Sequence, residues 1–240
     1  MNRSSRTPAD GSERVGIDLS SAPAARRAGL GASAEFVLEV LRSRAAARRL
    51  VSAFSGLLVL VAIGFLAFPL GTNMWAGRVQ ARLETQFVTK ELRVAYVDGE
   101  VAIGDSLTRI QIPAISVDDI VVEGTSESAL RAGAGHYPST PLPGEEGNVA
   151  IAGHRTTFGK PFANLDKLAK GDEIVLQTPI GTHHYRLSRD PYVVESGDWT
   201  PITQGPGSTL TLTTCHPKGS ARQRLIIKAE LESSSGIQAA

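Results

Sequence analysis

The strongest hydrophobic pattern in the chain is a long apolar run near its N-terminus. Residues 50–70 read LVSAFSGLLVLVAIGFLAFPL, and no charged residue occurs between Arg49 and Arg78. At ~1.5 Å per residue, a helix over this run is roughly 31 Å long, which matches the hydrocarbon core of a bilayer. The run therefore predicts a transmembrane helix over residues 50–70.

Two other interpretations of the apolar run fit less well. A cleaved signal peptide usually begins with a short polar region, whereas 49 residues precede this run. A helix buried in a soluble core normally keeps a polar side, and this run is apolar at nearly every position. We therefore favour a single-pass membrane anchor.

The flanks of the run predict its orientation. Arginines stand at positions 42, 44, 48 and 49, just before the run. The positive-inside rule then places residues 1–49 in the cytoplasm and the chain beyond residue 75 outside the cell membrane. Residues 1–49 lack apolar periodicity, apart from a short helix expected near 34–49, so we expect mainly a flexible tail. Trp75 fits an interfacial anchor.

The next segment, residues 71–105, is expected to form an extracellular helical stalk or linker. Residues 74–95 are rich in charge but carry apolar side chains at positions 75, 79, 83 and 87. This spacing is typical of a helix with one apolar face. A helix that leaves the membrane can continue through this stretch.

From about Ser106 the chain changes to short β-like runs separated by turn residues. The runs read RIQIPAI, DDIVVEG, GNVAIAGH, DEIVLQT, THHYRLS, YVVESG, STLTLTTC and RLIIKAEL. Their length and spacing favour an all-β barrel or sandwich over residues 106–232. Short helices are expected at 126–132 and 164–170, and residues 233–240 are expected to form a flexible C-terminal tail.

Composition narrows the class of protein. Twenty-five basic residues balance 24 acidic ones, for a net charge of +1, which argues against a nucleic-acid binder. The single cysteine excludes an intrachain disulfide, and no Cys/His cluster has zinc spacing. The nearest acids to the motifs below, Glu145, Glu146, Asp166 and Asp172, have no calcium-loop spacing. We expect neither a metal nor a cofactor.

Cys215 is a candidate nucleophile. A lone cysteine is more often a small buried hydrophobe. In the run TLTLTTC, however, Leu210 and Leu212 share one face of a strand, and the alternation puts Cys215 on the polar face with the threonines. Basic residues follow closely, and a reactive thiolate requires an exposed, electropositive setting.

His154 is the candidate partner for this thiol. It ends the apolar run NVAIAG and opens the polar loop HRTTFGKPF, a common place for a catalytic side chain. A structural histidine that caps the loop is the alternative. Of the other imidazoles, His216 would point to the opposite face from its neighbour Cys215, and His183 and His184 fit solvated strand positions; His136 is a further candidate.

Arg224 is a candidate for stabilising the thiolate or an oxyanion. It opens the final run RLIIKAEL, nine residues after Cys215, with loop-forming Pro217 and Gly219 between them. Neighbouring antiparallel strands would bring the two residues close together. A guanidinium beside a thiol lowers its pKa or donates hydrogen bonds to developing negative charge. A surface position is the alternative, and Arg222 replaces Arg224 if the register shifts by two.

These motifs together resemble the sortase family. The strand end TLTTC at 211–215, with Arg224 opening the next strand, resembles the family signature, and NVAIAGHRT at 148–156 resembles its histidine motif. The preceding segment GAGHYPSTPLPGEEGN at 133–148 is also similar, so the resemblance spans about 108–231. The stretches CHPKGSARQRL, HYP and GHRTTFG look most like the class E housekeeping sortases of actinobacteria.

The resemblance implies a mainly β fold, an eight-stranded barrel with short helices, that acts as a cysteine transpeptidase. Carried over to this chain, it makes Cys215 the nucleophile, His154 the acid/base partner and Arg224 the group that orients substrate and stabilises the oxyanion. Thr214 would help shape the substrate groove, and Tyr137 is a candidate for a groove contact.

The implied substrates are secreted proteins with a C-terminal sorting signal of the type Leu-(Ala/Pro)-x-Thr-Gly. Cys215 would attack the carbonyl between Thr and Gly and form a thioester. An amine of a cell-wall precursor, such as lipid II or peptidoglycan, would then resolve the thioester. A membrane anchor would hold the enzyme where both partners arrive.

Two alternatives from other classes remain open. A cysteine endopeptidase would use the same residues with water as the final acceptor. A non-catalytic, membrane-tethered β module would bind its partner without chemistry, although Cys215, His154 and Arg224 are all present.

Overall fold

The structure, a computed structural model, describes residues 35–39 and 45–236. Most of the predicted cytoplasmic tail and the last four residues lie outside the described residues. The chain divides into two compact units, Met1–Val61 and Ala62–Ala240, and each is described by itself. The described part of the first unit is helical, at residues 35–39 and in the first part of a long helix.

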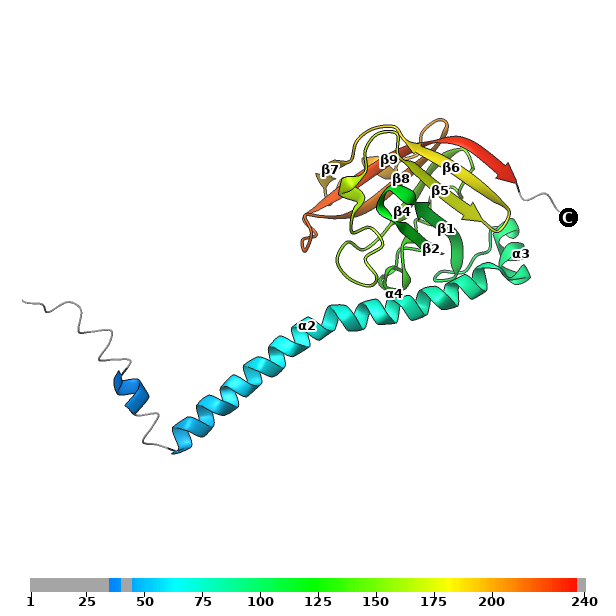
Figure 1. The fold of residues 1–240 in the computed structure, drawn as a ribbon. Coiled ribbons are helices and arrows are strands. Elements are labelled where there is room, and N and C mark those ends of the chain that lie inside the picture. The colour runs from blue at the N-terminus through cyan, green and yellow to red at the C-terminus, as the bar shows by residue number, and fades with distance from the viewer. Residues whose placement is uncertain (1–34, 40–44, 237–240) are drawn as a thin grey trace, which may run out of the picture. The chain divides into compact units, whose positions relative to one another are not determined.

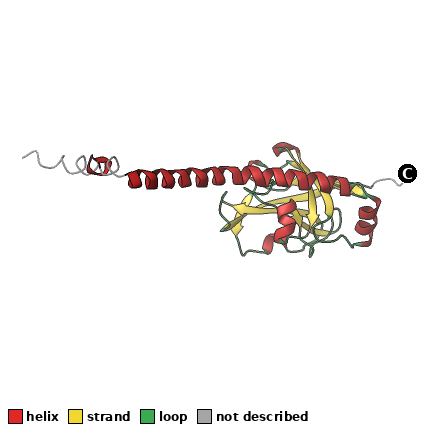
Figure 2. Ribbon diagram, turned by 90° about the horizontal axis from the view of Figure 1, so that it is seen from below, coloured by secondary structure: helices red, strands yellow, loops and turns green. Residues whose placement is uncertain are grey.

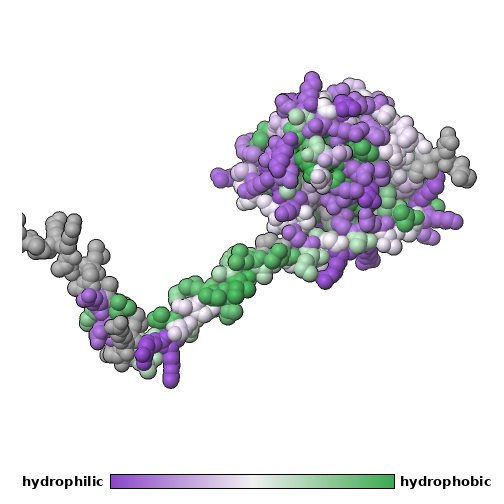
Figure 3. Space-filling view, viewed as in Figure 1, coloured by the Kyte–Doolittle hydropathy of each residue, from purple (hydrophilic) through white to green (hydrophobic). Residues whose placement is uncertain are grey.

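The long helix α2 spans Ala45–Phe87, 43 residues. It therefore joins the predicted membrane span and the first part of the predicted stalk in one helix. Its apolar N-terminal part exposes its side chains (Figure 3), and within the described residues it is the helix long and apolar enough to cross a membrane. The helix meets this criterion by its length and its composition.

The second helix of the stalk region is α3, Lys90–Asp98. Thr89 caps its N-terminus, because the Thr89 hydroxyl accepts a hydrogen bond from the Leu92 N–H at 3.3 Å. Its C-terminus ends at Gly99, whose φ of 70° suits a residue without a Cβ. Leu92 and Tyr96 are buried, so α3 packs onto the folded unit.

The remaining elements form the β domain (Figures 1 and 2). Its strands are β1 Ser106–Ile112, β2 Val117–Glu123, β3 Gly135–His136, β4 Gly147–Ala152, β5 Glu173–Thr178, β6 Gly181–Leu187, β7 Tyr192–Glu195, β8 Ser208–His216 and β9 Gln223–Gly236. Its helices are α4 Glu127–Ala132 and the short 3₁₀ turns η2 Pro113–Ile115, η3 Leu165–Lys167 and η4 Thr200–Ile202.

Eight of these strands close into a barrel, as expected. Their order is β6-β5-β1-β2-β3-β4-β8-β9, and a further pairing of β6 with β9 closes the ring. Strand β7 pairs with the first part of β9, outside the ring. Closure removes the exposed edges that an open sheet would present.

The end of β9 differs from the sequence expectation. The strand continues to Gly236, where it pairs with Gly181 of β6, so residues 233–236 are strand rather than tail. The helix expected at 164–170 is reduced to the three-residue turn η3, whereas the helix expected at 126–132 is present as α4, capped by Ser126.

Alternating apolar side chains fill the barrel interior. Leu210 and Leu212 of β8 and Ile151 of β4 are among its fully buried members, and Phe162 from the loop after β4 closes one part of the core. The alternation places β2 residue Val121 in the same core.

A second apolar cluster covers the outer side of β2. Ile120 and Val122 face outward from the barrel and pack with Leu83 of α2 and Ala129 of α4. Val79 and Phe87 of α2 pack against the same cluster. The apolar face of the predicted stalk helix therefore packs on the β domain, and the second half of α2 runs along the barrel (Figure 2).

Candidate functional site

Cys215 lies at the C-terminal end of β8, where it is partly exposed. Its direct partner in the antiparallel pairing with β9 is Arg224. The Arg224 Nη1 atom lies 3.8 Å from Cys215 Sγ and also donates to the carbonyls of Ala221 at 2.9 Å and Gln223 at 3.2 Å. The sequence predicted that Cys215 and Arg224 lie close together, and they do. Backbone carbonyls at the start of β9 and just before it hold the guanidinium in place.

The face of β8 that carries Cys215 is polar but covered. Thr211 is fully buried, and its hydroxyl donates to Asn148 Oδ1 at 2.7 Å and to the Pro201 carbonyl at 3.0 Å. Thr213, next along the same face, is also buried. Pro201 belongs to the β7–β8 connection, which therefore lies over Thr211 on this face.

A cavity of about 110 Å³ opens on this covered face. Its lining residues are Tyr137, Ser196, Asp198, Trp199, Pro201, Ile202, Thr213, Arg224 and Ile226. The Tyr137 hydroxyl lies 3.5 Å from Thr213 Oγ1. The cavity walls combine apolar side chains with hydroxyl, carboxylate and guanidinium groups. Tyr137 and Arg224 thus share one cavity, beside the strand end that carries the thiol.

Thr214, which the resemblance assigns to the shaping of the substrate groove, is not among the residues that line this cavity. It alternates to the opposite face from Thr213, and it is buried. Its hydroxyl donates to the Gly153 carbonyl at 2.7 Å. Thr214 therefore ties β8 to the chain just before His154 rather than lining the cavity.

His154 follows the end of β4, which runs parallel to β8. Ala152 is in register with Thr213, and the Gly153 N–H donates to the Thr213 carbonyl at 3.1 Å. The next residue, Arg155, donates to the Cys215 carbonyl at 3.2 Å. Both neighbours of His154 are thus bonded to residues 213–215, which brings the imidazole to the same end of the barrel as the thiol.

Gly153 is required for this close approach. An ideal Cβ at Gly153 would lie 2.5 Å from the Phe162 ring, well inside van der Waals contact. Phe162 itself is fully buried, and its N–H donates to the His154 carbonyl at 3.1 Å. The loop after His154 thus folds back onto the start of the same loop.

The His154 imidazole is half-buried, and burial lowers its pKa from the ordinary value. The positive charge of Arg131 lowers this pKa further. The described side chains of His154 and Cys215 share no hydrogen bond. Such contacts are often loose in a free enzyme and tighten when substrate binds.

Arg155 is the residue that sequence reasoning missed. Its side chain is almost fully buried, and Nη1 donates to the Cys215 carbonyl and, at 2.9 Å, to His216 Nδ1. Its Nη2 lies 3.1 Å from Asp166 Oδ1. One guanidinium therefore connects the loop of His154 to the strand end of Cys215. The sequence signal that could have identified Arg155 is its charge, directly after the apolar run NVAIA and next to His154.

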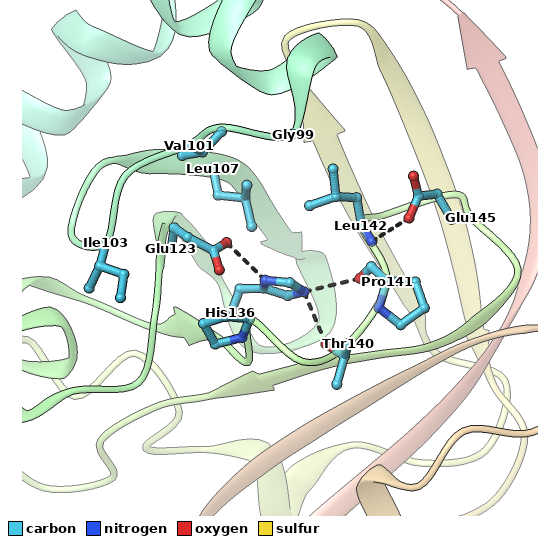
Figure 4. A pocket seen from close by; sticks show the side chains of 11 residues that line it. Gly99, Val101, Ile103, Leu107, Glu123, His136, Thr140, Pro141, Leu142 and Glu145 are labelled. Atoms are coloured by element: carbon cyan, nitrogen blue, oxygen red, sulfur yellow. Dashed lines mark hydrogen bonds and ion pairs between the residues drawn. The ribbon is translucent and has the colours of Figure 1, made fainter.

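The other four imidazoles have hydrogen-bond partners of their own. His136 is buried, with Nδ1 2.9 Å from Glu123 Oε2 and Nε2 3.0 Å from the Pro141 carbonyl, in a separate cavity of about 340 Å³ (Figure 4). His183 contacts Ser234, His184 contacts Glu173, and His216 accepts from Arg155.

Three of the four acids considered for a metal have other contacts. Glu145 accepts a hydrogen bond from the Leu142 N–H, Asp166 pairs with Arg155, and Asp172 accepts from the Ala169 N–H. Within the described residues, no three Cys, His, Asp or Glu side chains form a cluster suited to a metal ion.

The structure is a closed β-barrel with a partly exposed cysteine, a histidine and an arginine at one end. This arrangement is typical of proteins that use a cysteine as a nucleophile. Comparison with known families matches residues 110–232 to the sortase domain. The chain belongs to the sortase family, whose members are cysteine transpeptidases.

Individual relatives support the class E resemblance. The chain is 36% identical over 137 residues to sortase SrtE2 of Streptomyces coelicolor, covering 51% of this chain and 54% of that protein. The structure of sortase E1 of the same organism, with a tripeptide in the active site, matches with a TM-score of 0.52 and 28% identity, covering 55% of this chain and 91% of that one.

A sortase of another class gives a match of similar quality. A Clostridium perfringens sortase D5 transpeptidase superposes with a TM-score of 0.57 and 31% identity, covering 65% of this chain and 98% of that one. The chain spans 50–60% of the length of the curated relatives SrtE1, SrtE2 and Bacillus subtilis sortase D.

Proposed function

We propose that this chain is a membrane-anchored transpeptidase that cleaves a Leu-(Ala/Pro)-x-Thr-Gly signal between Thr and Gly. The observation that carries the proposal is the direct pairing of Cys215 with Arg224 beside a covered cavity, with His154 on the neighbouring parallel strand end. Membership of the sortase family supports the reaction class.

In the proposed reaction, His154 takes the thiol proton of Cys215, and the thiolate attacks the Thr carbonyl carbon to form a tetrahedral intermediate. Arg224 Nη1 lies 3.8 Å from the sulfur, and the N–H groups of the same guanidinium that the Ala221 and Gln223 carbonyls do not occupy donate hydrogen bonds to the negative charge on the substrate oxygen. The C–N bond to Gly then breaks, and His154 gives its proton to the leaving amine. A thioester of Thr on Cys215 remains.

The second half of the reaction reverses these roles. An acceptor amine attacks the thioester carbon, neutral His154 takes the amine proton, and the Cys215 thiolate leaves. The energy of the first amide bond is conserved in the thioester, so no nucleotide is required. The proposed acceptor is an amine of lipid II or peptidoglycan.

The cavity lined by Tyr137 and Trp199 is the proposed groove for the signal. Its walls mix apolar side chains with the Tyr137 and Thr213 hydroxyls. A related sortase E1 has a tripeptide in its active site, which supports a peptide ligand here. Tyr137, within 3.5 Å of Thr213, is a proposed contact for the second residue of the signal.

The proposed location is the cell membrane, with residues 1–49 in the cytoplasm and the β domain outside. The apolar first part of α2 and the arginines at 48 and 49 support this orientation. The proposed partners are secreted proteins that carry sorting signals and a membrane-linked or wall-linked amine. Tethering to one surface raises the effective concentration of both.

The test uses the full-length chain in detergent micelles with Leu-Ala-x-Thr-Gly and Leu-Pro-x-Thr-Gly peptides and an added amine. Mass spectrometry follows the products, and Cys215→Ala is the matched control. We expect a Thr–amine ligation product that the control does not form. Cleavage that yields only hydrolysed Thr, even at high amine, would favour a cysteine endopeptidase instead.

A third outcome would remove the catalytic proposal altogether. If neither peptide forms an adduct on Cys215 nor is cleaved, and Cys215→Ala supports normal anchoring of proteins to the wall in cells, the chain is a binding module. The ratio of the two peptide rates would define the preference at the second position of the signal.

A further inference from the structure

The loop after His154 has a backbone conformation that its residues do not favour by themselves. Phe158, Gly159 and Lys160 have φ values of 50°, 75° and 46°. Residues with a Cβ rarely adopt this left-handed region, because the Cβ crowds the following carbonyl. Contacts from elsewhere in the fold must therefore hold the loop in this shape.

One set of contacts comes from helix α2. Ala76 is buried against the loop, and a Cβ at Gly159 would lie 3.2 Å from the Ala76 Cβ. The Trp75 ring meets the Phe158 ring in an edge-on arrangement, with centroids 6.3 Å apart and planes at 77°. Edge-to-face geometry is favourable for aromatic pairs.

Phe158 in turn contacts the candidate acid/base residue. Its ring centroid is 5.3 Å from that of His154, with the planes tilted by 41°. The guanidinium carbon of Arg131, in α4, lies 5.4 Å from the Phe158 ring centre, within cation–π range. One half-buried ring is thus held by residues of α2 and α4 and lies against the imidazole.

Helix α2 is itself fixed to the β domain near this contact. The Gln80 side chain donates to the carbonyls of Ile120 at 3.1 Å and Ala132 at 3.0 Å, and accepts from the Ile120 N–H at 2.8 Å. Leu83 is buried in the apolar cluster over β2. These contacts fix the helix face that presents Trp75 and Ala76 to the loop.

We propose that Phe158 is a positioning residue for His154, and that Trp75 of α2 and Arg131 of α4 hold it in place. The segment of α2 just beyond the predicted membrane span then belongs to the architecture of the active site. A small displacement of a proton-transfer group lowers the reaction rate by a large factor. Holding the imidazole in a fixed position therefore keeps the rate high. The role of His154 rests on the proposed function, whereas its contact with Phe158 does not.

Charges around His154 do not change in the variants that test this idea. Arg131 of α4, which pairs with Glu127, faces the Phe158 ring. Helix α2 contributes Trp75 and Ala76, which carry no charge. A substitution at Phe158 therefore reports position rather than a change in charge.

The experiment uses alkylation of Cys215 by iodoacetamide in the full-length protein, together with peptide kinetics. The chain has one cysteine, so alkylation reports this thiol alone. We expect Phe158→Leu to slow alkylation near neutral pH and to change its pH profile, because a displaced imidazole no longer promotes the thiolate. The kcat for peptide cleavage should fall about tenfold or more, with KM changed less than about twofold.

Two further variants serve as controls. Phe158→Tyr keeps the ring and should restore alkylation and kcat. Phe87→Leu makes the same substitution on α2 against the cluster over β2, away from His154, and should leave both unchanged. Thermal unfolding of each variant shows whether the fold is intact.

The outcomes separate this inference from the proposed function. Wild-type alkylation and kcat in Phe158→Leu, no recovery in Phe158→Tyr, or equal losses in Phe87→Leu would each overturn the positioning role. If the wild-type protein ligates no peptide, the proposed function fails. The alkylation profiles of the variants still decide whether Phe158 positions His154.

Discussion

Arg224 lies directly opposite Cys215 in the pairing of β8 with β9, and its Nη1 atom is 3.8 Å from Cys215 Sγ. The same nitrogen donates to the carbonyls of Ala221 and Gln223. The guanidinium is therefore held before substrate arrives, and little reorganisation is required when negative charge develops.

The first prediction concerns this arginine. Arg224→Lys keeps a positive charge but loses the planar fork, and we expect kcat/KM for peptide cleavage to fall by about 10²-fold, mainly through kcat. The matched control is Arg222→Ala, because Arg222 is exposed and its side chain bonds only to Ser220 among the described residues. Equal activity of Arg224→Lys and wild type would argue against a role for Arg224 in the transition state.

The second prediction concerns Arg155, which joins the loop of His154 to the Cys215 carbonyl. Arg155→Met removes the hydrogen bonds to that carbonyl and to His216 and the shorter of the two ion pairs of Asp166, so we expect a loss of stability of about 1–3 kcal/mol and reduced kcat/KM. Chemical unfolding followed by tryptophan fluorescence measures the first effect. The control is Lys218→Ala, whose exposed Nζ lies 3.9 Å from Asp166 and should contribute less than about 0.5 kcal/mol. Unchanged unfolding of Arg155→Met would contradict the prediction.

The third prediction concerns Gly153. Gly153→Ala places a Cβ 2.5 Å from the buried Phe162 ring, so we expect a loss of about 1–3 kcal/mol of stability through overpacking. Adding Phe162→Leu should recover part of that loss, which is the signature of direct coupling. Gly205→Ala is the control, since nothing lies within 4 Å of its Cβ position. Additive losses in the double variant would show that the two sites do not clash.

The fourth prediction concerns the pH dependence of activity. Burial and then the positive charge of Arg131 lower the pKa of His154. Removing that charge in Arg131→Met favours protonation, so the pKa of His154 rises and the pH–rate profile moves to higher pH. The measurement is kcat/KM from about pH 5 to 10. Because two coupled groups titrate, the apparent values belong to the pair.

Arg131→Lys is the matched control for this prediction, because it retains the charge and should leave the profile in place. Glu127→Gln removes the negative partner of Arg131 and should move the profile in the opposite direction. A profile that stays fixed in Arg131→Met would mean that burial alone sets the pKa of His154.

Much of the site followed from local patterns. Alternation in TLTLTTC placed Leu210 and Leu212 in the core, and the structure confirms both positions. The short step from Cys215 to Arg224 predicted adjacent strands, which the register confirms. The barrel and the sortase family are confirmed as well.

Other features were beyond the reach of sequence. Residues 233–236 are mostly serine, so no apolar alternation marked them as strand; their backbone pairing with β6 alone makes them so. The Thr214 hydroxyl bonds to Gly153, 61 residues away, a contact that the sequence did not indicate. The polar face of β8 suggested exposure, but the β7–β8 connection covers Thr211.

The sequence by itself thus determined the apolar helix, the β-rich domain and the identity of the candidate nucleophile, histidine and arginine. These depend on periodicity and on neighbours within a few residues. Only the tertiary structure decided that Arg155 connects the two candidate catalytic strands and that Trp75 lies against Phe158. Those contacts join residues 60 or more positions apart, and no local pattern encodes which distant side chain will fill a given space.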